Sequence, residues 1–136
     1  MTDLATSVDA IALVAASLDT VSPFDPTRPY SPKEREPYDA LCDRFLRAVE
    51  VCLKYFRTYE RFTEAEVSET IRDLLLRMEK QGMVSSMKLW IDMRDVRNRI
   101  FHDYLPEQLS ELYGLIMGEM GQELLRVKQR IEERRV

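Results

Sequence analysis

Apolar residues recur every three or four positions along most of the chain, and no stretch alternates apolar and polar residues as a β-strand would. The first segment with helical spacing runs from residue 4 to 20. The stretch from Pro23 to Pro37 then holds five of the six prolines. Because proline fixes φ and has no amide hydrogen, we expect a stiff loop over residues 21–36.

The starts of the next two helices are marked by local capping patterns. Ser31-Pro32-Lys33-Glu34 has serine as N-cap, proline at the first helical position and glutamate at the third. Helical spacing of apolar residues continues from about residue 37 to 60. Thr63-Glu64-Ala65-Glu66 is a capping-box pattern, so a third helix is predicted from Thr63 until near Gly82.

Two more helices complete the predicted fold. A fourth is expected from about Ser86 to Tyr104, and a fifth begins with Pro106 at its first position and carries apolar residues as far as Ile131. The chain is therefore predicted to form one all-α domain over residues 1–136, an antiparallel bundle of four to five helices.

Composition and charge fit this class of fold and limit the partners. A chain of 136 residues with 45% hydrophobic and 32% charged residues fits one globular domain with a real core. The formal net charge of −4 argues against coating nucleic acid by bulk electrostatics, so any RNA contact has to be local. The basic residues between Arg126 and Arg135 are interpreted as a solvated helix face.

The cysteines and the apolar runs indicate a cytoplasmic protein. Cys42 and Cys52 fall ten residues apart on one predicted helix, so their Cα atoms lie roughly 15 Å apart, too far for a disulfide. No Cys/His cluster suits zinc, and we expect neither a metal nor another cofactor. No apolar run approaches the ~18 residues of a membrane span. Asp3 and Asp9 stand where a signal peptide is basic.

The candidate chemistry lies in Arg97-Asn98-Arg99-Ile100-Phe101-His102-Asp103-Tyr104, which contains the only histidine of the chain. Histidine is the side chain whose charge changes near neutral pH, which makes His102 a candidate general acid or base. An arginine, an amide and a phenol beside it suit phosphate chemistry. The competing interpretation is a helix-end histidine that hydrogen-bonds to the backbone.

Helical geometry indicates that this site needs two chains. Asn98 and His102 are one turn apart, so the amide can orient the imidazole. Arg97 and His102 are five positions apart and diverge by about 140° around the axis, so one straight helix cannot close both groups on one phosphate. A two-fold dimer would bring two arginines and two histidines to one cleft, and we therefore expect a homodimer.

The other faces of the fourth helix are predicted to serve the fold. Leu89, Met93, Val96 and Ile100 form the apolar stripe that faces the core. Trp90 and Phe101 are interpreted as packing residues. Two i,i+4 charge pairs are expected on another face, Lys88 with Asp92 and Arg99 with Asp103.

Arg97-Asn98-x3-His102-Asp103-Tyr104 resembles the Rx4HxY signature of HepT toxins in the HEPN superfamily of small helical proteins. The preceding Leu89-Trp90-Ile91-Asp92-Met93 and the helical layout from about residue 37 onward also fit that family. Residues 1–36, the N-terminal helix and the proline-rich loop, lie outside the resemblance.

The resemblance implies a metal-independent endoribonuclease that acts at a homodimer cleft as the toxin of a toxin–antitoxin pair. Arg97 and His102 would be the catalytic residues, with Asn98 in support. The partner would be a minimal nucleotidyltransferase (MNT) antitoxin that silences the toxin by transferring AMP to Tyr104.

Two alternatives stay open. The chain could be a non-catalytic subunit that binds a nucleotidyltransferase, in which case it would keep the dimer and cleave nothing. It could also be a plain helical interaction protein in which the motif is a coincidence. The complete set of Arg97, Asn98 and His102 favours the enzyme, because a degenerate subunit has no reason to keep catalytic residue types.

Overall fold

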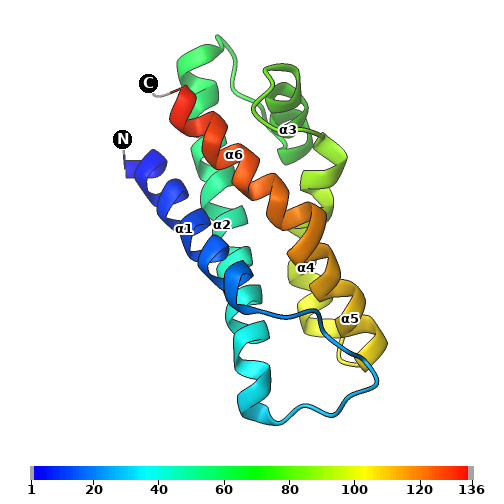
Figure 1. Cartoon of the computed structure of the whole chain (residues 1–136). Helices are drawn as coiled ribbons and strands as arrows, with labels where there is room; N and C mark the ends of the chain where they lie inside the picture. Colours follow the sequence, from blue (N-terminus) through cyan, green and yellow to red (C-terminus); the bar gives the residue numbers. More distant parts are fainter. Residues whose placement is uncertain (1, 135–136) are drawn as a thin grey trace.

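The computed structural model describes residues 2–134, and this part of the chain is all-helical with no strand (Figure 1). The elements are α1 (Thr2–Thr20), α2 (Pro32–Thr63), α3 (Ile71–Lys80), α4 (Met87–His102), α5 (Pro106–Leu115), a π-helical turn η1 (Ile116–Met120) and α6 (Gly121–Glu133). The all-α prediction is confirmed.

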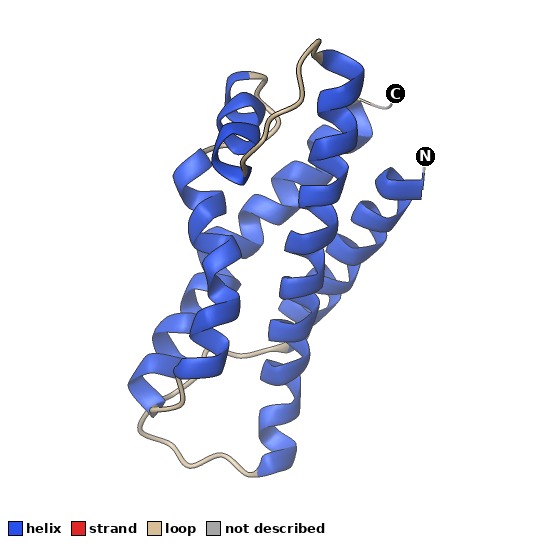
Figure 2. Cartoon of the chain, turned by 180° about the vertical axis from the view of Figure 1, so that it is seen from behind, coloured by secondary structure: helices blue, strands red, loops and turns tan. Residues whose placement is uncertain are grey.

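Long helices run up and down the molecule. α1 lies along α2, α6 crosses α2 and touches α1, and α4 and α5 lie on the side of α2 away from α1 (Figure 1). Both chain ends and α3 lie toward one end of the molecule, and α5 and the start of α2 lie toward the other (Figures 1 and 2). α4 therefore connects the two ends.

The predicted start of the second helix is confirmed and begins the longest helix of the fold. The Ser31 hydroxyl accepts the Glu34 amide at 3.2 Å, and the Glu34 carboxylate accepts the Ser31 amide at 3.0 Å. The helix then continues through Pro37 to Thr63 without a break. Both hydrogen bonds of this capping box lie within four residues of sequence, so the sequence pattern alone was sufficient to predict the helix start.

The loop that precedes this helix is ordered by aromatic contacts. Phe24 stacks on Tyr30 at 4.5 Å between ring centroids and meets Tyr113 edge-on at 5.1 Å. Tyr38 stacks on Tyr113 at 5.0 Å and donates a hydrogen bond to the Ser22 carbonyl. The loop crosses to α5 before it returns to the start of α2 (Figure 1). Its prolines and aromatics thus attach the first helix to the bundle.

The predicted start of the third helix is wrong. Thr63 belongs to the last turn of α2, where its hydroxyl donates to the Tyr59 carbonyl at 2.9 Å, and α3 begins only at Ile71 with Thr70 as N-cap. The buried carboxylate of Glu60 overrides the local pattern, because it accepts hydrogen bonds from the amide and the hydroxyl of Ser68 and holds residues 64–70 out of helical geometry.

Two helix boundaries near the C-terminus also differ from the prediction. α4 ends at His102, two residues before Tyr104, since Asp103 adopts an extended conformation. The predicted fifth helix is interrupted at η1, where Gly118 has φ −101° and ψ −114°. A Cβ on Gly121 would lie 2.4 Å from the Ile116 carbonyl oxygen. Glycine at this position therefore lets the chain pass through the wide turn.

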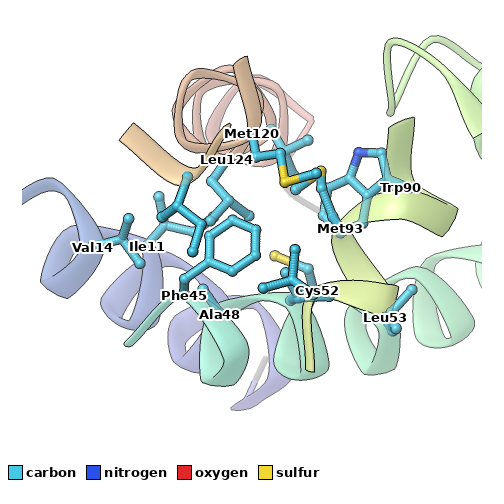
Figure 3. Packing of buried hydrophobic residues seen from close by; sticks show 14 of the residues in the cluster. Ile11, Val14, Phe45, Ala48, Cys52, Leu53, Trp90, Met93, Met120 and Leu124 are labelled. Atoms are coloured by element: carbon cyan, nitrogen blue, oxygen red, sulfur yellow. The ribbon is translucent and has the colours of Figure 1, made fainter. Parts of the chain in front are cut away.

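The hydrophobic core lies where α1, α2, α4 and α6 meet (Figure 3). Its largest side chains include Phe45, Trp90 and Met93, all fully buried. Cys42 and Cys52 are free and buried, as predicted, and burial raises the pKa of the Cys42 thiol to about 12. Among the described residues no helix is both long and apolar enough to span a membrane.

The interpretation of the C-terminal basic residues as a solvated face is wrong for two of them. Arg126 is exposed, as expected, although it pairs with the buried Glu123 at 3.1 Å. Arg130 donates to the Met83 carbonyl at 3.2 Å, and Arg134 donates to the Gln81 carbonyl at 2.8 Å. Arg130 on α6 and Arg134, the C-cap residue of that helix, thereby fasten the turn between α3 and α4.

Candidate functional site at the end of α4

The two predicted catalytic side chains lie on the last turns of α4 and are both exposed. Neither Arg97 nor His102 makes a side-chain hydrogen bond or ion pair within the described residues. Asn98 does not touch His102: its amide donates to the Asp95 carboxylate at 3.2 Å. The structure therefore does not reproduce the expected Asn98–His102 contact. It also gives no support to a His102 that is satisfied by the backbone.

Arg97 borders an open groove of about 630 Å³ between α1, α2 and the end of α4. The groove is lined by Thr6, Asp9, Ala10, Leu13, Asp43, Leu46, Arg47, Glu50, Val51, Arg97 and Phe101. Asp43 pairs with Arg47 at 2.9 Å, whereas Asp9 and Glu50 carry no ion pair with any residue that the structure describes. His102 is not among the lining residues, as expected from the divergence of the two side chains.

Tyr104 lies in a different cavity from Arg97. Because the helix ends at His102, the extended Asp103 directs Tyr104 toward a second hollow of about 380 Å³ between α2, α4 and α5. The Tyr104 side chain is 76% exposed, and its hydroxyl has no partner in the described part of the chain. Arg97 and Tyr104, which share a face on an ideal helix, are thus separated around the end of α4.

The prediction that Phe101 is a packing residue is wrong for the single chain, where its ring is 71% exposed. Leu13 is 50% exposed and Leu105 is 54% exposed. Together with Tyr104 these three residues form what we call the apolar collar around the end of α4. Large apolar side chains gathered in one region mark an interaction surface. Trp90, by contrast, is fully buried, as predicted.

The charge pairs on the neighbouring face of α4 are confirmed. Lys88 pairs with Asp92 at 3.3 Å, and Arg99 pairs with Asp103 at 2.9 Å. Arg99 also reaches Glu111 on α5 at 3.3 Å. These pairs occupy Arg99 but leave Arg97 free, which distinguishes the two arginines of the motif.

Within one chain, the arrangement can bind an anion at Arg97 and can transfer a proton at His102, but it does not direct both groups to one point. Residues 2–134 contain no cluster of histidine, cysteine, aspartate or glutamate side chains that could hold a metal ion. The carboxyls with lowered pKa and full burial, Glu60 and Glu123, lie in the other half of the molecule and serve the fold.

Sequence reasoning missed the collar. Phe101 and Leu105 follow helical apolar spacing and were indistinguishable from core residues, since burial depends on which neighbours the fold supplies. The only local signal is their position: Phe101 precedes the last residue of α4, and Leu105 precedes Pro106, the first residue of α5.

No model of a known protein family matches this chain, and a search of curated proteins finds no match either. The resemblance to HepT toxins therefore depends on the segment from Arg97 to Tyr104 and on the order of the helices.

Proposed function

We propose that the protein is a metal-independent endoribonuclease, the toxin of a pair whose antitoxin is an MNT-type nucleotidyltransferase. The observation that carries the proposal is the state of Arg97 and His102. Both are exposed at the end of one helix and have no partner among residues 2–134, although the fold pairs most other charged groups around α4. Groups that the fold does not use are available for a substrate.

The proposed reaction is an in-line transesterification within RNA. A neutral His102 takes the proton of the ribose 2′-OH, and the 2′ oxygen attacks the adjacent phosphorus. The bond from phosphorus to the 5′ oxygen breaks, that oxygen leaves and takes up a proton, and a 2′,3′-cyclic phosphate remains. Arg97 holds the non-bridging oxygens with its fork of N–H donors and stabilises the developing charge.

The active form in this proposal is a two-fold dimer. Arg97 and His102 of one chain point apart, so the acid–base and anion-binding groups of one cleft come from two copies. The apolar collar supports this arrangement, because a second copy over the end of α4 would remove Phe101 and Leu105 from water.

Tyr104 is the proposed acceptor of AMP. Its exposed hydroxyl is accessible to a nucleotidyltransferase. Since Tyr104 borders a different cavity from Arg97, the added nucleotide would act through bulk and charge at the cleft between two chains, rather than by pairing with Arg97 of its own chain. Co-expression with the antitoxin should add the mass of AMP to the wild type but not to Tyr104→Phe. AMP on the phenylalanine variant would assign the acceptor elsewhere.

The nuclease is tested with Arg97→Ala and His102→Ala, and with Arg94→Ala as the matched control. Arg94 is also exposed on α4 and has no ion pair within the described part of the chain. We expect His102→Ala to lower the rate of RNA cleavage about 10²–10⁴-fold, the usual contribution of a general base, and Arg97→Ala to lower it as well. Arg94→Ala should cleave normally. Unchanged cleavage in either test variant rules out the assignment.

A second candidate is the non-catalytic subunit that binds a nucleotidyltransferase. The contact of Asn98 with Asp95 favours it, because the imidazole then lacks the orienting partner that a general base needs. A purified wild-type dimer that binds a nucleotidyltransferase but leaves RNA intact would establish this candidate over the nuclease.

A further inference from the structure

A second surface with exposed apolar side chains, set among charged residues, lies away from the end of α4. An open groove of about 590 Å³ runs between α3 and the loop 64–70, which we call the clamped loop. Val67 is 55% exposed and Leu76 is 39% exposed in this groove. In Figures 1 and 2, α3 lies toward the end of the molecule opposite α5. The groove is therefore separate from the apolar collar.

The fold holds the clamped loop with polar contacts, several of them to the buried carboxylate of Glu60. The Glu60 carboxylate accepts two hydrogen bonds from Ser68, and Arg57 donates to the Ser68 carbonyl at 2.6 Å. Arg77 donates to the Glu66 carbonyl at 2.6 Å and pairs with Glu60 at 3.0 Å. A segment whose sequence favours a helix is thus fixed in another conformation. Because this loop is already ordered, a partner that binds its outward side chains does not have to order the loop backbone.

The outward side chains of the groove are acidic. Glu66, Glu69 and Asp73 have no side-chain hydrogen bond or ion pair among residues 2–134. The two cations of the groove are Arg77, which Glu60 and Glu64 already neutralise, and Lys80. Negative charge around exposed apolar side chains repels RNA and anionic membranes, and it attracts a basic segment with apolar residues.

We infer that this groove binds a basic amphipathic segment of a partner protein, with apolar side chains on Val67 and Leu76 and lysine or arginine side chains beside Glu66, Glu69 and Asp73. The inference is independent of the proposed nuclease. A partner bound here leaves Arg97, His102 and Tyr104 uncovered, so the protein can engage it and a second copy at the same time.

The test uses a fluorescent synthetic peptide of leucine and lysine at amphipathic helical spacing, with its leucine–glutamate counterpart as the charge control. Binding is followed by fluorescence anisotropy, and the bound site is mapped by amide NMR shifts on the full chain. We expect the lysine peptide to bind and to shift residues 64–81. The glutamate peptide should not bind.

Two variants make the test specific to the groove. Glu66→Gln with Glu69→Gln should weaken binding about fivefold, which is about 1 kcal/mol for the two exposed charges together. Glu36→Gln with Glu119→Gln changes the net charge equally on exposed, unpaired residues elsewhere and should leave the affinity unchanged. Val67→Ser should weaken binding without a change in net charge.

Equal loss of affinity in both double variants would show attraction by net charge alone and would overturn the inference. Shifts that concentrate on residues 97–105 would overturn it too, because the peptide would then prefer the apolar collar. Absence of binding by the lysine peptide has the same consequence.

Discussion

The two halves of α4 differ in how their polar groups are used. In the first half, the Trp90 indole donates to the buried Glu123 carboxylate at 2.8 Å, and Ser86 caps the helix by accepting the Leu89 amide. In the last turns, the side chains of Arg97 and His102 have no partner in the described structure. One helix thus carries polar groups that hold the fold together, including Arg99 in its last turns, beside two side chains that have no partner among the described residues.

The difference distinguishes a polar residue that stabilises the fold from one that is available for a substrate or partner. Glu123 is fully buried and accepts hydrogen bonds from the amide and the hydroxyl of Ser85 at 2.9 and 2.6 Å, from Trp90 and from Arg126. Burial alone would raise the pKa of this carboxyl, but these hydrogen bonds outweigh it and the pKa lies below its ordinary value. The lowered pKa of Glu123 thus accompanies a buried network that holds the start of α4, whereas the candidate site consists of exposed groups without partners among the described residues.

The largest effect is expected for Glu123→Ala. It leaves the Trp90 indole, the Ser85 amide and Arg126 without their shared acceptor, and loss of one member of a buried charged network costs about 3–5 kcal/mol. The free energy of unfolding from urea titrations measures this loss. Glu119→Ala is the matched control, because that glutamate is exposed and unpaired on the turn just before, and it should change stability by less than about 0.5 kcal/mol. Equal effects of the two variants would contradict the structural role of Glu123.

An intermediate effect is expected on acidification. Burial would raise the pKa of Glu60, but hydrogen bonds from Ser68 and the charge of Arg77 lower it. The pKa of Glu123 is lowered in the same way by its own hydrogen bonds. A carboxyl whose pKa is lower in the folded state contributes stability above its unfolded pKa and loses it as the pH falls through the folded value. The free energy of unfolding should thus be constant near neutral pH and decrease below the ordinary glutamate pKa of 4.5.

Glu123→Gln separates the two carboxyls in this experiment. The amide cannot titrate, so the decrease of stability in acid should be shallower in the variant than in the wild type. Parallel curves for the two proteins would mean that Glu123 does not contribute to acid sensitivity.

The sequence predicted local features well and tertiary ones poorly. The helix starts at Ser31-Pro32 and at Pro106 and the burial of Trp90 follow from neighbours within a few residues or from strong apolar spacing, and they are confirmed. The capping box at Thr63 failed because Glu60, a buried charge, competes for the segment through Ser68 and Arg77. The break at η1 was invisible, since glycine in a regular apolar pattern does not reveal that the chain changes its winding there.

The candidate site was predicted only in its local features, because its surroundings depend on tertiary contacts. Helix geometry alone gave the divergence of Arg97 and His102, and both side chains are indeed free and face different surroundings. The position of Tyr104 in another cavity depends on the extended conformation of Asp103, and the exposure of Phe101 depends on which helices fail to cover it. Neither dependence is encoded in residue spacing.

The smallest effect on stability is expected at the free end of α4. Arg97→Ala and His102→Ala remove no hydrogen bond or ion pair of the described chain, and alanine is the best helix former, so the free energy of unfolding should change by less than about 0.5 kcal/mol or rise slightly. Arg99→Ala is the matched comparison, because it breaks the pairs with Asp103 and Glu111 and should cost more than either variant. The measurement is urea unfolding at a protein concentration low enough to keep the chain monomeric. A clear loss of stability in His102→Ala under these conditions would mean that the histidine holds the helix end, which is the competing, structural interpretation of the motif. A loss that appears only at higher concentration would place His102 between two copies, since oligomerisation makes stability depend on concentration.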